Sequence, residues 1–466
     1  MPPDPSAEFA RANRAFIVAA AGCGKTETVA RASGIHSQGR QLVLTHTHAG
    51  VRALKDRLGK VHADRRRVHV DTIAGFALRY AASFPIRSGL PSPKPASSEW
   101  NATYDAARRV LETSYGRTIL SESYSGMFVD EYQDCISSQH QLVMAMADVL
   151  PCRIVLDPLQ GIFGWAGPLV AYERDLVPSF DRLPDLVTPY RWRATNPSLG
   201  EWLLEVRQHL MTGDDIDLSG APIRRDSADA QTQVSVCLDV ARVDGSAVAI
   251  GHWPNDCHAI AQRLLGRFTV MEPIECRDLL DWAEKLEAAT GPARAVVLVE
   301  FAALCMTQVS TALRRATATL RLNQLPALRA NTPNRPAVEA LIAVAGDPAL
   351  GPVVDAMTVV EATHDAVLHR RELWSEMKRS VSICSRVQSS SLRDVAWSVR
   401  DSGRSGGRRV EHRTVSRTVL VKGLEFDHAI VLCADELARS DLYVALTRGS
   451  RSLAVLSTTA ALRPRG

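Results

Sequence analysis

One short stretch combines two glycines, a lysine and a hydroxyl side chain in an order that suits phosphate binding. It reads AAAGCGKT over residues 19–26, after an apolar run and before a helix-like pattern. Glycines let backbone N–H groups approach phosphate oxygens closely, and the start of a helix adds a favourable dipole. Lys25 is placed to reach the outer phosphates of a nucleotide, and Thr26 to hold Mg²⁺ through its hydroxyl. The alternative is a glycine-rich turn without function, since Ala19 replaces the first glycine of the general pattern.

A pair of acidic residues follows another apolar run. Residues 128–134 read FVDEYQD. Metal-assisted phosphoryl transfer needs one carboxylate near Mg²⁺ and a second group that orients the attacking water. Asp130 fits the first role and Glu131 the second. Taken alone, this motif is equally well explained as an acidic strand end on a solvated surface.

Strand-like and helix-like segments alternate around these motifs. Most of the apolar runs are followed by polar or glycine-containing turns, and helical patterns lie between them. This alternation predicts a parallel α/β sheet in the first part of the chain. The apolar runs occur at 16–20, 41–44, 68–70, 127–129 and 153–156.

The second part of the chain has strand-like runs at both ends and a helical centre. Residues 277–380 have apolar positions at three- and four-residue spacing and few strand signals. A glycine-rich basic segment, 402–409, is typical of a flexible linker. We therefore expect a second sheet that a helical insertion splits. The strand-like runs occur at 247–252, 268–271, 418–421, 429–433 and 452–456.

The composition is that of a water-soluble globular protein. Of 466 residues, 46% are apolar and 23% charged, and the formal net charge of +4 permits nucleic-acid binding without predicting it. The nine cysteines include no CxxC pair, which argues against a zinc site and favours a reducing compartment. The longest apolar run, 295–306, is interrupted by Glu300 and is too short to span a bilayer. We expect a cytoplasmic protein without a membrane partner.

The two motifs together resemble those of superfamily 1A helicases of the UvrD/Rep/PcrA type. Further stretches match that family in its order, and VKGLEF and YVALTR are close matches to motifs V and VI. Several motifs in one fixed order are strong evidence, because each would otherwise have to arise independently. The matching stretches are 44–51 (motif Ia), 71–76 (the next DNA-contact motif), 157–167 (motif III), 188–191 (motif IV), 421–426 (motif V) and 443–448 (motif VI).

The resemblance implies that ATP and Mg²⁺ are bound between two lobes. Gln160 would sense the γ-phosphate, Arg191 and Arg448 would stabilise its developing charge, and Glu131 would complete the catalytic set. The implied nucleotide contacts are Ala21, Gly22, Cys23, Gly24, Lys25, Thr26, Glu27, Tyr190 (against adenine) and Glu425. The implied Mg²⁺ ligands are Thr26 and Asp130.

The resemblance also implies DNA contacts along both lobes. Trp165 and Phe76 are the candidates for stacking on bases, although ordinary core packing is the alternative for each. We interpret the basic segment 400–417 as a solvated linker rather than a phosphate contact. The HxH pair at 46–48 is interpreted as polar residues near DNA, since no further metal ligand lies at suitable spacing. The candidate DNA contacts are Thr45, His46, Thr72, Phe76, Trp165 and Lys422.

The fold implied by the resemblance is α/β, with two RecA-like parallel-sheet domains. The first domain would cover 1–185 and carry a short helical insertion at 77–125. The second would cover 186–274 and 412–466, and a larger helical insertion would occupy 275–411.

Several features depart from the family. The upstream glutamine motif that reads adenine is absent, and both insertions are small, which puts efficient unwinding in doubt. The reduced size is similar to the UvrD-like subunit of Gabija-type antiphage systems, in which such a protein partners an OLD-family nuclease. The motifs leave little chain at either end, so we expect any nuclease activity on another polypeptide.

The sequence leaves three functions open. The first is a DNA-dependent ATPase that translocates along single-stranded or partly duplex DNA, or a 3′–5′ helicase. The second is a DNA- or nucleotide-sensing subunit that activates a partner nuclease in antiphage defence. The third, an unrelated phosphate-loop enzyme such as a small-molecule kinase, leaves motifs III to VI unexplained.

Overall fold

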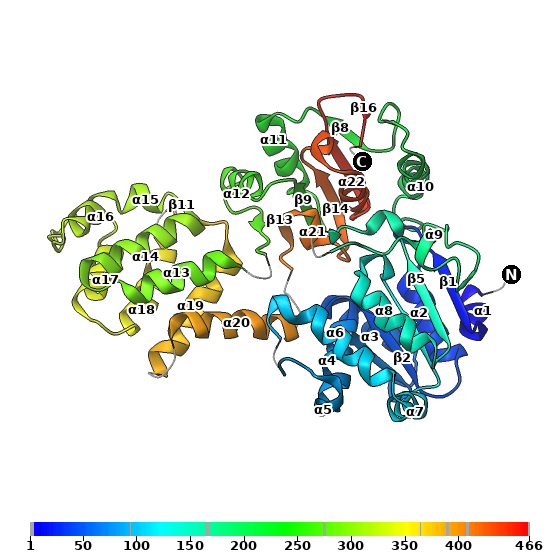
Figure 1. The fold of residues 1–466 in the computed structure, drawn as a ribbon. Helices are drawn as coiled ribbons and strands as arrows, with labels where there is room; N and C mark the ends of the chain where they lie inside the picture. Colours follow the sequence, from blue (N-terminus) through cyan, green and yellow to red (C-terminus); the bar gives the residue numbers. More distant parts are fainter. Residues whose placement is uncertain are drawn as a thin grey trace.

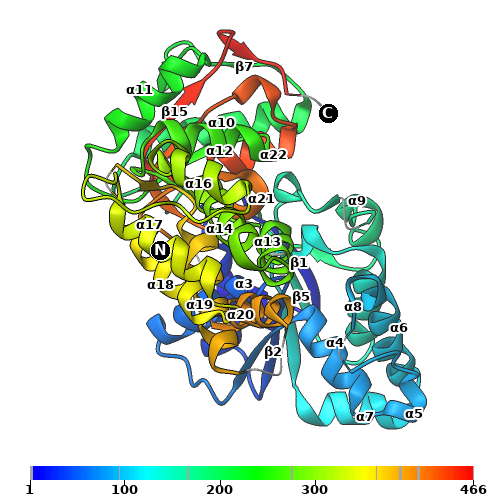
Figure 2. The same ribbon diagram turned by 90° about the vertical axis from the view of Figure 1, so that its left-hand side faces the viewer.

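The computed structural model describes residues 4–93, 95–164, 167–273, 276–363, 365–387, 391–406 and 410–464. A first lobe (5–182) and a second lobe (190–270 and 413–462) lie one above the other, and a helical lobe (277–406) projects from their side (Figure 1). Seen from that side, the helical lobe stands in front of the other two (Figure 2).

A six-stranded parallel sheet forms the centre of the first lobe, in the order β3-β2-β4-β5-β1-β6. Its strands are β1 (Arg14–Val18), β2 (Gln41–Thr45), β3 (Val68–Thr72), β4 (Gly126–Val129), β5 (Cys152–Leu156) and β6 (Asp181–Arg182). Strands β2, β4 and β5 are buried throughout, as parallel strands covered on both faces must be. All five predicted apolar runs fall on strands of this sheet, which confirms the predicted α/β fold.

Helices cover both faces of this sheet. On one face lie α1 (Pro5–Arg11), α2 (Lys25–Arg31) and α3 (His48–Lys60), and on the other lie α4 (Ile73–Ala82), α6 (Trp100–Leu111) and α8 (Ser137–Ala147). The Thr47 hydroxyl caps α3 by accepting a hydrogen bond from the Gly50 N–H at 3.0 Å. The helix then buries Leu54 and Leu58, each contributing roughly 1.5–3 kcal/mol of hydrophobic stabilisation.

The second lobe contains another six-stranded parallel sheet, in the order β10-β13-β9-β14-β15-β8. Its strands are β8 (Arg224–Asp226), β9 (Ala247–Gly251), β10 (Thr269–Val270), β13 (Arg413–Arg417), β14 (Phe426–Val431) and β15 (Gly449–Leu456). Helices α10 (Pro197–Thr212), α11 (Ala230–Val240), α12 (Pro254–Arg263) and α22 (Arg439–Leu446) pack on its faces. One expected strand, 418–421, is wrong: it forms the helical turn α21 (Thr418–Val421) that follows β13.

The helical lobe interrupts the second sheet between β10 and β13, two neighbouring strands, as the sequence predicts. Its helices are α13 (Arg277–Ala288), α14 (Gly291–Cys305), α15 (Val309–Ala312), α16 (Arg314–Arg321), α17 (Arg335–Gly346), α18 (Gly351–Glu361), α19 (Arg371–Arg386) and α20 (Leu392–Gly406). Trp374 stacks on Phe301 in its core, with 5.6 Å between the ring centroids. The pattern missed a short antiparallel pair, β11 (Met306–Thr307) with β12 (Val367–Leu368).

Two predictions concern the segments that connect the lobes. The linker expected at 402–409 is helical up to 406, within α20, and 407–409 lie outside the described residues. The domain boundaries inferred from the resemblance stay a prediction. Within the described part of the chain, no helix combines the length and apolar character needed to cross a membrane.

A buried ion pair fixes the helical lobe to the second lobe. The Arg370 guanidinium donates to both carboxylate oxygens of Glu272, at 2.7 and 2.6 Å, and also to Asp278 at 2.7 Å. Arg370 is 2% exposed and Glu272 is 0% exposed. Arg400 adds hydrogen bonds to the Glu372 carboxylate and the Pro273 carbonyl. The segment that enters the helical lobe is thereby held to the start of α19 and to α20.

We expect Arg370→Ala to lower the free energy of unfolding by about 3–5 kcal/mol, because it removes the bidentate guanidinium from the buried Glu272 carboxylate. Arg371→Ala, at the exposed neighbouring position, is the matched control and should change stability by less than about 0.5 kcal/mol. Urea denaturation followed by tryptophan fluorescence measures both. Equal midpoints for the two variants would contradict this account of the junction.

Candidate nucleotide site at the seam between the two sheets

The glycine-containing loop lies where β1 ends and α2 begins. Gly22 and Gly24 have φ of 69° and 87°, the left-handed region that glycine tolerates best. A Cβ on Gly22 would lie 2.5 Å from the Trp192 ring, and one on Gly24 would lie 3.5 Å from the Tyr190 ring. The glycines therefore allow both the loop conformation and the close approach of the second lobe.

Lys25 begins α2 and is buried at the end of the loop. Its Nζ donates to the Ala19 carbonyl at 3.2 Å and lies 3.8 Å from a carboxylate oxygen of Asp157. Asp157, at the end of β5, is itself 0% exposed. It also accepts hydrogen bonds from Gln160 at 2.6 Å and from Arg207 of α10 at 3.4 Å. A buried carboxylate thus ties the loop lysine to the second lobe.

The acidic pair lies at the end of β4, beside the loop. The Thr26 hydroxyl donates to an Asp130 oxygen at 3.5 Å. Burial raises the pKa of Asp130, and the neighbouring Glu131 carboxylate raises it further. Burial alone would raise the pKa of Glu131 too, but the charges of Lys25 and Lys422 outweigh it and lower that pKa. Glu131 has a φ of 57°, which is unusual for a residue with a Cβ.

The hydroxyl of Thr26 and the carboxylate of Asp130 are a donor set that suits Mg²⁺. Both ligands are hard oxygens, and Mg²⁺ in phosphate-binding sites takes one or two protein ligands and completes its shell with phosphate and water. Among the described residues, no group of three or more His, Cys, Asp or Glu side chains could form an all-protein metal cage. The residues therefore fit a magnesium ion that arrives with a nucleotide.

Two arginines of the second lobe lie at the same seam. The Arg191 guanidinium donates to the Thr447 carbonyl at 2.6 Å and to Glu425 at 2.5 Å, and its backbone N–H donates to the Gly22 carbonyl at 3.1 Å. Its Nε is buried and has no hydrogen-bond partner among the described residues. An orphaned donor of this kind, beside the loop, suits an anionic ligand.

Arg448 is almost fully buried behind Arg191. It donates to the carbonyls of Val444 and Leu424, at 2.8 and 3.0 Å, and to the Thr447 hydroxyl at 2.9 Å. Burial, and then the charge of Arg191, lower its pKa to about 10, so it stays protonated at neutral pH. Its charge also acts on Glu131 of the first lobe. The structure therefore brings the predicted acidic pair and both predicted arginines together.

Two aromatic residues at the seam were missed by the sequence reasoning. The Tyr443 hydroxyl accepts a hydrogen bond from the Ala21 N–H at 3.0 Å, and the Trp192 indole donates to the Gly449 carbonyl at 2.7 Å. Both side chains are 1% exposed. Trp192 directly follows the stretch 188–191, and Tyr443 begins the stretch 443–448. Their places in these motifs could have identified them from the sequence.

Other predicted nucleotide contacts have different surroundings. Glu27 forms ion pairs with Arg57 at 3.3 Å and with Arg31 at 3.8 Å. Cys23 is buried, which raises the pKa of its thiol to about 11 and keeps it neutral. Tyr190 is 58% exposed beside Gly24, so one face of its ring is free for a ligand.

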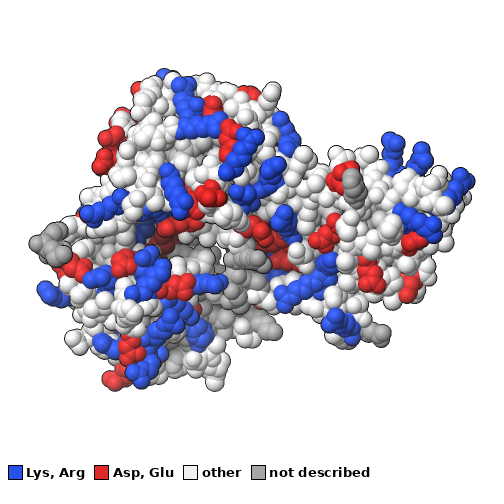
Figure 3. Space-filling model, turned by 180° about the vertical axis from the view of Figure 1, so that it is seen from behind, with Lys and Arg blue, Asp and Glu red and all other residues white. Residues whose placement is uncertain are grey.

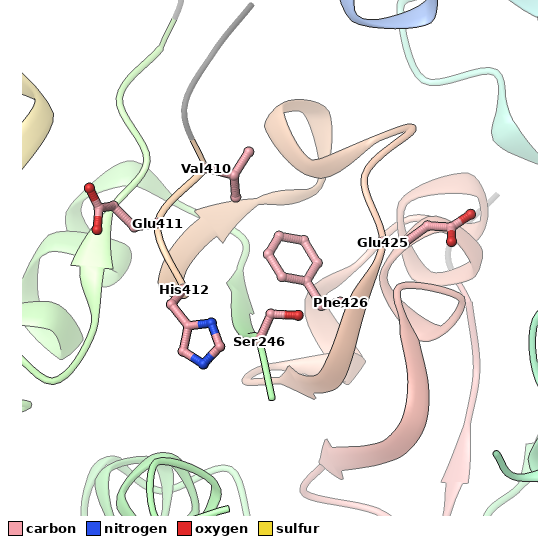
Figure 4. Close-up of a pocket in the computed structure, with 6 residues that line it drawn as sticks. All are labelled: Ser246, Val410, Glu411, His412, Glu425 and Phe426. Atoms are coloured by element: carbon pink, nitrogen blue, oxygen red, sulfur yellow. The ribbon is translucent and has the colours of Figure 1, made fainter. Parts of the chain in front are cut away.

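Glu425 also borders a pocket of about 380 Å³ on the second lobe. The residues that line this pocket are Ser246, Val410, Glu411, His412, Glu425 and Phe426. Figure 4 shows the Glu425 carboxylate directed away from His412 and Ser246. Because that carboxylate accepts the 2.5 Å hydrogen bond from Arg191, its charge belongs to the seam and not to the pocket.

The candidate DNA contacts of the first lobe are mostly occupied by internal contacts. Thr72 caps α4 by accepting a hydrogen bond from the Gly75 N–H at 2.8 Å. Phe76 corrects an expectation: it is 4% exposed and stacks on Tyr80 in the core, so it does not present a ring to a base. Its position on α4 places the Phe76 side chain on the helix face that packs against the sheet. Trp165 lies outside the described residues.

His46 and Thr45 lie at the carboxyl end of β2. Thr45 is buried, and the His46 ring lies 3.4 Å from the Cys135 sulfur. Burial, and then the charge of Lys422, lower the pKa of His46 to about 3, so it is neutral at pH 7. A phosphate contact through a charged His46 is therefore not supported.

Lys422 corrects a further expectation. Its ammonium donates to both oxygens of Asp134, at 2.5 Å each, and to the Gln160 carbonyl. The side chains of Lys422 and Asp134 are 7% and 2% exposed, respectively. Instead of an open DNA contact, the lysine forms a buried ion pair that joins the second lobe to the first, since Asp134 is the last residue of the acidic motif.

We expect Tyr443→Phe to destabilise the protein by about 1–3 kcal/mol, because the Ala21 N–H is then buried without an acceptor. Tyr115→Phe removes a hydroxyl from a 44% exposed ring and is the matched control, with a change near zero. Thermal denaturation of the two variants beside the parent protein provides the measurement. A Tyr443→Phe protein as stable as its control would remove this hydrogen bond from the account of the seam.

No protein-family model and no curated protein matches the chain. Among solved structures, it is similar to Pif1 helicase from Candida albicans, with 9% identity and a TM-score of 0.31 over 56% of this chain and 52% of that one. It is also similar to Pif1 helicase from Bacteroides in complex with ADP-AlF3 and ssDNA, with 12% identity and a TM-score of 0.28 over 56% and 54% of the two chains. The matched part covers about half the length of these structures, and a likeness this weak assigns no role to any residue here.

Proposed function

We propose that the protein is a nucleic-acid-dependent ATPase of the superfamily 1 helicase type. The observation that carries this proposal is the meeting of Lys25 and Asp130 from the first lobe with Arg191 and Arg448 from the second. Phosphoryl transfer builds negative charge on the transferred group. A lysine, a metal-binding carboxylate and two arginines at one seam are the groups that stabilise such charge.

Each of these side chains has a distinct role in the proposal. The backbone N–H groups of the loop bind phosphate oxygens, and the Lys25 ammonium neutralises the outer phosphates. Thr26 and Asp130 would hold Mg²⁺, which supplies further charge neutralisation when bound. Glu131 orients a water molecule and accepts its proton. The two arginines stabilise the charge that develops as the terminal phosphoryl group leaves.

The protein partners of these side chains suggest how binding is coupled to movement. A triphosphate would draw Lys25 from Asp157, and Arg191 from Glu425. The loop is joined to the second lobe through the hydrogen bonds of Ala21 with Tyr443 and of Gly22 with Arg191. A change in the loop would therefore shift one lobe against the other, which moves any strand bound across both.

The nucleic acid is proposed to be single-stranded or partly duplex DNA. This choice, and movement in the 3′ to 5′ direction, rest on the motif resemblance. Lys422 is proposed to reach a strand only after its ion pair with Asp134 opens, since both side chains are buried in the structure.

A second candidate is a DNA-sensing subunit that activates a partner nuclease, of the OLD family in an antiphage system. Three exposed leucines between α16 and α17 favour a protein partner: Leu322, Leu325 and Leu328 are 71%, 54% and 40% exposed. Exposed apolar clusters of this kind often mark interaction sites. Strand displacement by the protein alone supports the motor. DNA-triggered nuclease activity of a partner, without displacement, supports the sensor.

We expect single-stranded DNA to raise the ATP turnover of the parent protein several-fold and Lys25→Ala to abolish that turnover. The substitution removes the cation that neutralises the outer phosphates. Phosphate release measured across a DNA titration tests both points, and Lys378→Ala, in the helical lobe, is the control that should keep the parent rate. A turnover rate that stays flat across the titration counts against the proposal.

We expect Arg191→Lys and Arg191→Ala to lower kcat by about 100-fold or more while nucleotide binding falls much less. The planar guanidinium acts on charge that develops only during the transfer, and a lysine does not reproduce its geometry. Single-turnover hydrolysis and binding of a fluorescent ATP analogue separate the two effects. An unchanged kcat would exclude Arg191 from the catalytic set.

A further inference from the structure

One segment of the first lobe carries an unusual excess of positive charge. Residues 48–67, which comprise α3 and the turn after it, contain seven Lys or Arg side chains and two Asp side chains. This excess of five charges is larger than the net charge of +4 on the whole chain. Figure 3 shows Lys and Arg side chains gathered on the first lobe, at the lower left of the molecule.

The outer face of α3 presents this charge to solvent. Leu54 and Leu58 are buried against the sheet, whereas Arg52, Lys55 and Lys60 are exposed. Arg65, in the following turn, folds back along the helix: a Cβ on Gly59 would lie 2.8 Å from its guanidinium. We call the side chains of Lys55, Lys60 and Arg65 the α3 strip.

Internal contacts account for some basic residues of the segment but not for the strip. Arg57 pairs with Glu27 at 3.3 Å, and Arg67 donates to the Ser37 carbonyl at 2.7 Å. Within the described part of the chain, Lys55, Lys60 and Arg65 make no hydrogen bond or ion pair. The dipole at the end of α3 explains a cation in its last turn, such as Lys60, but not one at Lys55.

The strip lies on the part of α3 that leads away from the seam. Helix α3 begins at His48, directly after the carboxyl end of β2. It is 13 residues long, or roughly 20 Å, and the strip covers its second half and the turn after it. Near its middle, Lys55 acts with Arg40 and Arg79 on His69, whose pKa is lowered by burial first and then by these charges. Several basic groups thus converge on one side of the lobe.

We propose that the α3 strip binds the phosphate backbone of nucleic acid that extends beyond the seam. Cations that no protein carboxylate neutralises, held along a helix and the turn after it, bind successive phosphates without reading the bases. Such contacts make binding strongly dependent on salt. The proposal deepens the proposed function and rests on it for the class of ligand. It adds a contact surface outside the stretches that resemble helicase motifs.

The test compares two triple variants that remove the same charge. The strip variant is Lys55→Gln, Lys60→Gln and Arg65→Gln. The matched control is Arg314→Gln, Arg315→Gln and Arg329→Gln, three exposed arginines of the helical lobe. Fluorescence anisotropy gives the affinity for a short single strand, for the same strand with a duplex extension, and for a longer single strand, each at several salt concentrations.

We expect the strip variant to bind the short strand like the parent and to lose the added affinity of an extension. The slope of log affinity against log salt should fall by about 2–3 for the duplex extension, since each lost phosphate contact removes about 0.9. If the strip variant loses affinity for only one kind of extension, that extension, duplex or single-stranded, supplies the phosphates. Either result supports the strip. The control should match the parent.

Three results would overturn the proposal. In the first, the extension adds as much affinity to the strip variant as to the parent protein. In the second, the control variant loses as much affinity as the strip variant, and in the third, polyglutamate displaces the extended DNA as effectively as unlabelled DNA does. The last would indicate a surface for acidic proteins. ATP turnover with the short strand is measured in parallel. Its failure to rise in the parent protein counts against the proposed function, whereas the anisotropy comparison tests the strip.

Discussion

The carboxylate of Asp157 is the constraint on which the seam depends. A charge that is 0% exposed is tolerated only when cations and hydrogen-bond donors surround it. Lys25 and Gln160 of the first lobe and Arg207 of the second supply these groups. The same residue therefore positions the loop lysine and holds α10 against the first sheet. Because Arg207 comes from the second lobe, parting the two lobes would remove one of the two cations beside this carboxylate.

Much of the architecture follows from local sequence patterns. Strands buried on both faces must be apolar throughout, so runs such as 127–129 and 153–156 identify the first sheet directly. The order of short motifs also indicates which side chains meet, because parallel strands bring loops from distant parts of the chain to one edge. The gathering of the acidic pair with Arg191 and Arg448 agrees with that order.

What the sequence could not show depends on partners far away in the chain. Lys422 looks like an open cation until Asp134, distant in sequence, is seen beside it. Arg207 belongs to no motif, and only the fold brings it to Asp157. Phe76 lies in a motif that resembles a DNA contact, but its helix turns its ring into the core. The segment 418–421 is rich in β-branched residues, yet its short length between β13 and β14 leaves it as a helical turn.

The bidentate pair of Arg370 with Glu272 has a mechanical consequence. It lies where the chain crosses between the second sheet and the helical lobe, and a buried pair of this geometry tolerates little sliding. This pair couples the orientation of the helical lobe to that of the second sheet. Under the proposed function, a small rotation of the second sheet would therefore produce its largest displacement at the far end of the helical lobe.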